Sequence, residues 1–427
     1  MRIQPASFAF TLLLGLLASV PYSGIDMSLP ALAATGAALG APPADVGFTM
    51  SVFMLSLATA PLVYGPVSDR YGRRPVVVFG VTLFVVGSLA CALAQSLPVL
   101  LVCRFGQGCG AASTTLTFAI IRDLFEGDNA RAKMANVVIA INVVTLIAPT
   151  AGAALLALGS WRLIYTIQFV MGLVLLIALV TGFAESAKID QTNRLAPSII
   201  GRSYLQVLRH PISFAYILVG AAAGGTVMAY VTGSSLFFIN SMGLRPNRYG
   251  LIFSACSGSV MAGAFLDRRL VAWNVSPAYV LMRGLTVSAV ASGLLLATTL
   301  VGWVPLLLVV SLLVAVGLAF GLTIPNAIRA TMHPLPQIAG AVGAVSGSIQ
   351  MMAGAVSSGL VACLYDGRSA LSMAAVMTPC SLLALASVPP SVAFSQVSVM
   401  PALDGLDHLR RRCCHARRLR SFQADRN

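Results

Sequence analysis

Apolar runs of about the length needed to cross a lipid bilayer recur along almost the whole chain. A membrane-spanning helix needs about 20 mostly apolar residues. The sequence predicts twelve such helices, at 8–31, 46–66, 75–95, 98–121, 134–157, 162–183, 211–237, 247–266, 277–298, 302–325, 338–363 and 370–394. Because lipid offers no hydrogen-bond partner to an open backbone, such runs fold as helices. We therefore expect an all-α, polytopic membrane protein with twelve transmembrane helices.

The few charged residues support this class and exclude a soluble protein. Only 9% of the 427 residues are charged and 58% are hydrophobic, whereas a soluble domain carries about 25% charged residues. The net charge of +14 would suit nucleic acid, but apolar runs separate the basic residues into small clusters. Nucleic-acid binding needs a contiguous basic surface. We expect membrane lipids, and no nucleic acid, around this chain.

The basic residues indicate how the chain is oriented and divided. Sorted by alternate loops, 22 of the 27 Lys and Arg residues fall on one side together with both termini, and an excess of basic residues marks the cytoplasmic side. The widest gap between spans separates a six-helix half at 1–183 from a second half at 211–396. Between them we expect a cytoplasmic linker at 184–210, and after them a basic cytoplasmic tail at 397–427 that anchors to anionic lipid headgroups.

The loop after the second span carries a dense motif of glycines and charges. Its residues are Gly65, Asp69, Arg70, Gly72, Arg73 and Arg74. Glycines permit a tight turn, and an aspartate there could pair with an arginine and with the positive N-terminus of the span at 338–363. From charge alone, a plain positive-inside loop explains the motif equally well. The pattern G-x-x-x-D-R recurs 198 residues later, from Gly263 to Arg268, which indicates duplicated halves, as in many secondary transporters.

The loop motif resembles the signature between helices 2 and 3 of the major facilitator superfamily. The fourth span adds Arg104-Phe-Gly-Gln107-Gly108-Cys-Gly110-Ala111-Ala112, which is similar to that superfamily's R-x-x-Q-G-x-G-A-A motif. Asp26-Met-Ser-Leu-Pro30 in the first span and Arg122-Asp123 at the end of the fourth resemble one branch of its drug:proton antiporters. That branch is the bicyclomycin and chloramphenicol resistance (Bcr/CflA) family of multidrug exporters.

The resemblance implies a fold of two six-helix halves and a transport function. Proteins of this family work by alternating access, exchanging protons for drugs or other small, largely apolar molecules across the bacterial inner membrane. The resemblance also implies that the chain needs no cofactor besides the proton gradient and acts as a monomer. By the same resemblance, Asp69, Arg73 and Asp123 form an ion-pair relay that locks the cytoplasmic ends of the second and fourth spans.

The fifth span departs from the antiporter signature G-x-x-x-G-P-x-x-G-G. In the matching stretch only Pro149 and Gly152 agree with it, although Ala148 and Ala153 are still small. Small residues allow close packing against a neighbouring helix, so the packing role survives. The departure leaves a second function open, namely proton-coupled import of a small metabolite.

Asp26 and Arg104 are the two charges that the spans place inside helices. An ionised side chain at the bilayer centre costs about 2.5–3.5 kcal/mol, so both residues should face the bundle interior or water. Burial disfavours an ionised carboxylate and a nearby arginine favours it, so Asp26 is expected to load and release a proton. Two alternatives stay open, a solvated Asp26 at the outer mouth and an Arg104 that clamps the carbonyls of a neighbouring helix.

Asp26 and Arg104 are expected to border a central cavity between the two halves. Further polar or small residues are expected to line this cavity. They are Gln107 and Gly108, which share a helical face with Arg104, and Tyr22, Asn142 and Gln350. Nothing in the sequence predicts catalysis, because its four histidines lie at span ends or in the tail and form no catalytic motif. We predict no metal site either, since Cys413-Cys414-His415 offers too few ligands, too close together, for zinc.

Overall fold

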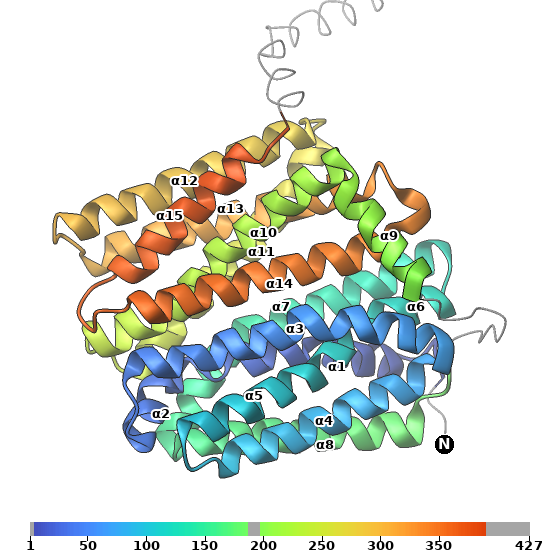
Figure 1. Cartoon of the computed structure of the whole chain (residues 1–427), viewed down its shortest axis with the longest axis horizontal. Helices are drawn as coiled ribbons and strands as arrows, with labels where there is room; N and C mark the ends of the chain where they lie inside the picture. Colours follow the sequence, from blue (N-terminus) through green and yellow to red (C-terminus); the bar gives the residue numbers. More distant parts are fainter. Residues whose placement is uncertain (1–3, 187–196, 390–427) are drawn as a thin grey trace, which may run out of the picture. The chain divides into compact units, whose positions relative to one another are not determined.

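The computed structural model describes residues 4–186 and 197–389, and Met1–Ser387 form one compact unit. Every regular element in these described ranges is a helix (Figure 1). The first half contains α1 (Phe8–Asp26), η1 (Leu29–Ala31), α2 (Leu32–Leu39), α3 (Pro43–Tyr71), α4 (Arg73–Leu93), α5 (Leu97–Ala112), η2 (Ser113–Leu116), α6 (Thr117–Leu124), α7 (Gly127–Leu158) and α8 (Trp161–Gly182). The second half contains α9 (Pro197–Arg209), α10 (Pro211–Ser235), η3 (Leu236–Ser241), α11 (Pro246–Ala272), α12 (Pro277–Leu300), α13 (Leu306–Met332), η4 (Pro336–Ile338), α14 (Ala339–Leu364) and α15 (Leu371–Ala386).

Ten helical stretches in the described ranges are long and apolar enough to cross a membrane. The other two predicted spans are present in a different form. The fourth is the uninterrupted series α5, η2 and α6, and the twelfth is the apolar, 16-residue α15. The predicted all-α membrane class is therefore confirmed.

Several predicted boundaries differ from the structure; the first span, for example, was predicted to end at residue 31, but its helical stretch continues to Leu39. The predicted linker at 184–210 contains a helix, α9, and the side chain of Val207 in this helix packs in a buried apolar cluster with Ile217 of α10 and Val342 of α14. The last span was expected to reach residue 394, whereas α15 ends at Ala386. Residues 187–196 of the linker and the tail at 397–427, with Cys413-Cys414-His415, lie outside the described residues.

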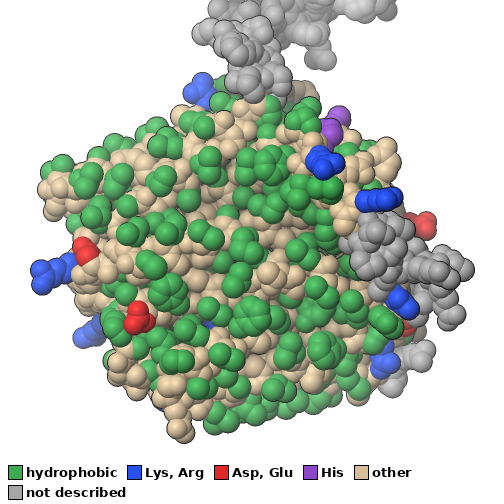
Figure 2. Space-filling model, in the orientation of Figure 1, with side chains coloured by type: hydrophobic (Ala, Val, Ile, Leu, Met, Phe, Trp, Pro, Cys, Tyr) green, Lys and Arg blue, Asp and Glu red, His purple; other side chains and the backbone are tan. Residues whose placement is uncertain are grey.

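The helices run between two ends of the unit (Figure 1). We call the end with the turn at residue 72 and the connections 125–126, 273–276 and 333–335 the basic end. The end with the connections 40–42, 94–96, 159–160, 242–245, 301–305 and 365–370 is the far end. Figure 2 shows hydrophobic side chains over the face between the ends and charged side chains gathered at both ends. This distribution matches a protein whose flank faces lipid.

The two halves contact each other mainly toward the far end. Hydrogen bonds cross between the halves there from Ser235 Oγ to Leu29 O (2.6 Å), from Ser254 Oγ to Leu146 O (2.7 Å) and between Ser254 Oγ and Thr150 Oγ1 (3.0 Å). Small residues permit the approach, since a Cβ on Gly47 of α3 would lie 2.9 Å from the Cβ of Ala362 on α14. Nearer the basic end, the Tyr204 hydroxyl of α9 donates to Leu62 O of α3 at 3.4 Å.

Candidate functional site

Asp26 is the last residue of α1 and is almost completely buried, with 5% of its surface exposed. The structure therefore does not place it in a solvated outer mouth. The side chain of Thr145 on α7 interacts with the carboxylate, but Asp26 Oδ2 has no hydrogen-bond partner. A buried polar atom without a partner is costly and calls for an explanation, which can be a functional one.

Three tyrosines lie within electrostatic reach of Asp26. Tyr22 is one helical turn earlier on α1 and is 37% exposed. Tyr230 of α10 stacks on Phe253 of α11, with 5.6 Å between ring centroids, and its buried hydroxyl has no partner. The third is Tyr249 of α11. Asp26 therefore lies where α1 and α7 of the first half meet α10 and α11 of the second.

Arg104 on α5 is fully buried among helices of the first half. Its Nη1 donates to Gly24 O of α1 at 3.1 Å and to Gln107 Oε1 at 2.8 Å. The guanidinium carbon lies 4.2 Å from the ring centroid of Phe53 and 5.7 Å from that of Tyr165. Such cation–π contacts stabilise a desolvated arginine.

The contacts of Arg104 continue as a buried hydrogen-bond network. Gln107 Nε2 donates to Ser88 Oγ and to Gln168 Oε1, each at 2.8 Å, and Gln168 Nε2 donates to Ser23 O at 3.3 Å. The network thus includes hydrogen bonds to two carbonyls in the last turn of α1, from Arg104 to Gly24 O and from Gln168 to Ser23 O. A positive charge at the C-terminus of a helix is favoured by the helix dipole. This arrangement is the carbonyl clamp that the sequence left open as an alternative.

The structure separates the two buried charges that the sequence placed in one cavity. Arg104 packs against α1, α3 and α8, whereas Asp26 faces α7, α10 and α11. Within the described residues no ion pair involves either of them. They share the end of α1 and make different contacts there.

The other expected cavity residues lie on several helices. Gly108 is a point of close approach, because a Cβ there would overlap the Ser56 hydroxyl of α3. Gln350 of α14 packs against α10, where a Cβ on Gly224 would lie 2.7 Å from Gln350 Cγ. Asn142 is half-buried on α7, three residues before Thr145.

Of the two signature residues, Pro149 and Gly152, it is Gly152 that brings α7 against the end of α1. Both are buried, and a Cβ on Gly152 would overlap the carbonyl oxygen of Met27. Only a glycine permits this approach. Gly152 therefore packs α7 next to Asp26, whereas Pro149 O lies 3.3 Å from the position of a Cβ on Gly250 of α11.

At the basic end, Arg73 joins the ends of three helices. Its Nη1 lies 2.5 Å from Asp69 Oδ1 of α3, and its Nε lies 2.9 Å from Asp123 Oδ2 of α6. Arg73 Nη1 also donates to Ser68 Oγ at 2.5 Å. The expected contact between Asp69 and the start of α14 is not formed among the described residues, and the Asp69 side chain is 63% exposed. The halves contact each other mainly toward the other end, so this carboxylate pairs with Arg73 and otherwise faces solvent.

The remaining motif residues shape the loop and its surroundings. Gly65 faces open space. The guanidinium of Arg70 lies 5.4 Å from the ring centroid of Tyr71, and Arg74 Nη2 donates to Val180 O of α8 at 2.8 Å.

Glu185 makes contacts with the loop motif that were not predicted from the sequence. Its Oε1 accepts from Arg73 N at 2.8 Å and its Oε2 from Arg74 N at 3.1 Å, so it caps the N-terminus of α4. Gly72 has φ +97°, and a Cβ there would overlap this carboxylate. A carboxylate at a helix N-terminus is stabilising. This capping contact could not be predicted from the sequence, because Glu185 lies in the predicted linker and the capped residues are more than 100 positions away in the chain.

Comparison with known proteins identifies the family. Residues 11–362 match the sequence profile of the Major Facilitator Superfamily. The chain belongs to the Major Facilitator Superfamily. It is 27% identical over 370 residues to a bicyclomycin resistance protein homolog of Haemophilus influenzae, covering 85% of this chain and 91% of that protein.

Two further comparisons extend this result. The chain is 29% identical over 250 residues to the multidrug resistance protein MdtL of Shigella dysenteriae serotype 1, covering 57% of this chain and 61% of MdtL. The crystal structure of a mutant of the nucleoside transporter NupG superposes with a TM-score of 0.71 at 13% identity, over 88% of this chain and 98% of NupG. The last likeness shows the fold alone.

Membership of the Major Facilitator Superfamily confirms several expectations from the sequence. The chain is a multi-pass membrane transporter and not an enzyme, and its relatives include the bicyclomycin resistance type that the motifs indicated. Members of this superfamily generally work without a cofactor and use ion gradients. The described residues hold no group of three or more His, Cys, Asp or Glu side chains that could bind a metal ion.

Proposed function

We propose that this facilitator is a proton-coupled antiporter that exports drugs or other small, largely apolar molecules by alternating access. The observation that carries the proposal is Asp26, a buried carboxylate with an unpartnered Oδ2 at the junction of the two halves. A carboxylate inside a membrane protein is a functional candidate by default. The names of the bicyclomycin resistance and MdtL relatives support drugs as the cargo.

In the proposed cycle, Asp26 takes a proton from the outer side and substrate leaves there. Release of the proton to the cytoplasm then resets the carrier. One charge crossing the membrane yields about 2.3 kcal/mol per 100 mV, so one proton per neutral molecule is enough to concentrate a substrate. Tyr22, Gln350 and Asn142 are proposed to line the substrate path beside Asp26. Gln107 and Gly108 would shape it from α5.

A second candidate is proton-coupled import of a small metabolite by symport. The observation that favours it is Ala148 and Ala153, which replace two glycines of the antiporter signature. Both alanines are buried, with 4% and 0% of their surface exposed, so this stretch of α7 still packs closely. The packing argument therefore favours export, and the direction of transport decides between the two.

The proposed arrangement in the cell follows from the basic residues. We infer halves at 1–183 and 211–396, a linker at 184–210 and a tail at 397–427, with both termini cytoplasmic in the bacterial inner membrane. The basic end then faces the cytoplasm and meets anionic lipid headgroups. The chain is proposed to act as a monomer whose only ligands are protons and its small-molecule substrate.

The proposed cytoplasmic lock consists of Asp69, Arg73 and Asp123, with Glu185 holding the backbone of the same loop. Asp69 is proposed to bind the N-terminus of α14 when the basic end closes, where the helix dipole favours a carboxylate. Labelling of a cysteine in the first turn of α14 checks this contact. With Asp69→Asn it should remain exposed throughout the cycle, whereas unchanged protection would contradict the lock.

The experiment that tests the function compares Asp26→Asn with Asp45→Asn in inside-out vesicles. Asp45 is an exposed carboxylate in the first turn of α3 and serves as the matched control. An inside-acid pH gradient should drive uptake of a fluorescent drug by the wild type and by the control. Asp26→Asn should abolish it. Normal gradient-driven transport by Asp26→Asn would contradict the proton role of Asp26. Gradient-driven exit of substrate from the wild-type vesicles would favour the symporter.

A further inference from the structure

α10 continues directly into η3, which is π-helical over Leu236–Ser241. A π turn is rare and most often found at functional sites. Here the Met242 N–H bonds back to Phe237 O at 2.9 Å, and Gly243 with φ +65° ends the segment. The residue directly before the π turn is Ser235, whose hydroxyl makes the hydrogen bond to Leu29 O in the other half.

A single side chain contacts both ends of this π turn. Tyr365 follows α14, and its hydroxyl donates to Leu236 O at 2.8 Å and lies 2.9 Å from Ser241 Oγ. Partial burial of the phenol raises the pKa of Tyr365, although hydrogen bonds from Ser241 and Asn240 act in the other direction. The hydroxyl therefore stays protonated at physiological pH and remains able to donate.

We propose that Tyr365 is a positioning residue that holds α10 in its π-helical form and thereby keeps the far end of the transporter shut. We call Leu29, Ser235, Leu236–Ser241 and Tyr365 the far-end gate. The inference rests on the proposed alternating access, and it assigns the closing contacts at the end opposite the Arg73 cluster.

The π geometry matters because it sets the direction in which Ser235 points. A π turn holds one more residue than an α-helical turn, and one residue of an α-helix corresponds to a rotation of about 100°. Conversion to an α-helix would thus rotate Ser235 relative to Ser241 and break its hydrogen bond to Leu29 O. The Tyr365 hydroxyl opposes this conversion because it bridges the carbonyl of Leu236 and the hydroxyl of Ser241.

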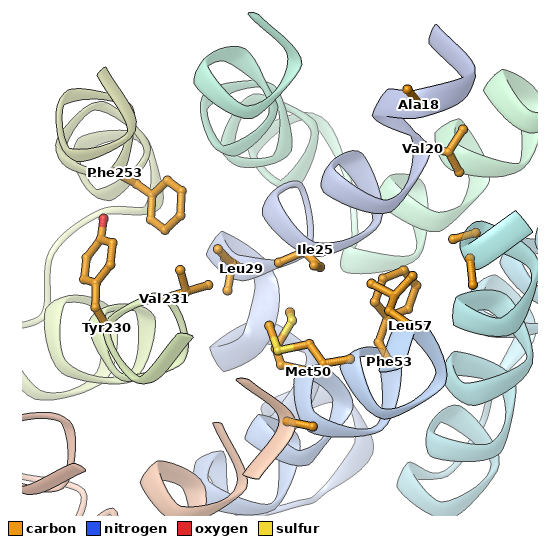
Figure 3. Packing of buried hydrophobic residues seen from close by; sticks show 14 of the residues in the cluster. Ala18, Val20, Ile25, Leu29, Met50, Phe53, Leu57, Tyr230, Val231 and Phe253 are labelled. Carbon is orange, nitrogen blue, oxygen red and sulfur yellow. The ribbon is translucent and has the colours of Figure 1, made fainter. Parts of the chain in front are cut away.

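Apolar side chains complete the seal around this hydrogen bond. Figure 3 shows Leu29 directed toward Val231 of α10, with Ile25 and Met50 on its other side. Leu29 and Met50 are 0% exposed and Val231 is 4% exposed. These apolar contacts include no ion pair. The hydrogen bonds of the hydroxyl groups therefore determine how stable the closed far-end gate is. Each interhelical hydrogen bond in a membrane changes such an equilibrium by about threefold on average.

The same gate is joined to the proposed proton site. Leu29 is three residues after Asp26, and the two are connected by the turn at Met27 and Ser28 where α1 is broken. Movement of Leu29 away from α10 therefore pulls on the segment that carries Asp26. Opening of the far end and exposure of the carboxylate are in this way one motion.

The experiment measures access to the cavity from the far side. In a background without the eight native cysteines, Ile25→Cys places a thiol one turn inside the gate. A membrane-impermeant maleimide is added only to the far side of oriented vesicles. We expect Tyr365→Phe to raise the labelling rate about three- to tenfold, as the loss of such hydrogen bonds implies. The matched control Tyr279→Phe removes a hydroxyl from an exposed tyrosine of α12 and should leave the rate unchanged.

A Tyr365→Phe labelling rate at or below the control rate overturns the proposal. If that variant does not fold, Ser241→Ala, which removes only the second contact of the same hydroxyl, takes its place and must also raise the rate. The assay needs neither substrate nor a pH gradient. Loss of proton coupling therefore overturns the proposed function without changing this result, and unchanged labelling overturns the gate while transport persists.

Discussion

Two buried charges flank the end of α1, and they differ in the contacts that their surroundings provide, although each keeps one buried atom without a hydrogen-bond partner, Arg104 Nε and Asp26 Oδ2. Arg104 donates to Gly24 O and Gln107 Oε1 and stacks on the ring of Phe53. Asp26 has a neighbouring Thr145 and an Oδ2 with no partner. The first charge is held by the packing of one half, and the second lies between the halves.

The difference supports the proposal that Arg104 stabilises the fold and that Asp26 acts in transport. A connected buried hydrogen-bond network makes a packing arrangement rigid, so Arg104, through its Nη1 bonds to Gly24 O and Gln107 Oε1, is suited to holding the broken end of α1. An unsatisfied carboxylate is a cost that folding alone does not explain. In the proposed antiport cycle, this carboxylate is the group that binds and releases the proton.

The largest expected effect is on stability, from Arg104→Met. Methionine has a similar length, but it leaves the Gln107 Oε1 acceptor without its strong donor and removes the cation–π contact. We expect the free energy of unfolding to fall by about 3 kcal/mol, measured by denaturant titration in detergent. A variant of wild-type stability that fails to transport would show instead that Arg104 acts on substrate or protons.

A smaller effect, of opposite sign, is expected for Asp26→Asn. The amide has the same shape and replaces a buried carboxylate with a neutral group, so the free energy of unfolding should rise by about 1 kcal/mol. The control is Asp267→Asn, since Asp267 is equally buried but paired with Arg329 at 2.8 Å and with Asn326 at 2.6 Å. That change should cost about 2 kcal/mol. Equal losses in both variants would mean that Asp26 is as well satisfied as Asp267.

The sequence predicted the spans well because apolarity is a local property. It also singled out Asp26 and Arg104, since a charge inside an apolar run is conspicuous. It did not predict that they face different helices, because spacing tells which residues share a helix face but not which helix lies opposite. The break after Asp26 and the π turn at Leu236–Ser241 were missed for the same reason, as the contacts around them come from other helices. The break and the π turn depend on contacts that Leu29 and Tyr365 make with residues far away in the chain.

The smallest expected effect is a coupling energy, and it tests the comparison most directly. A double-mutant cycle between Arg104→Met and Gln168→Ala should give about 1 kcal/mol, because both residues belong to one hydrogen-bond network through Gln107. The same cycle between Arg104→Met and Asp26→Asn should give less than about 0.5 kcal/mol, the value for sites without shared partners. Both energies come from unfolding titrations of the single and double variants. A coupling between Arg104 and Asp26 as large as that between Arg104 and Gln168 would mean that the two charges form one site. In that case the end of α1 would transmit protonation of Asp26 directly to the Arg104 network.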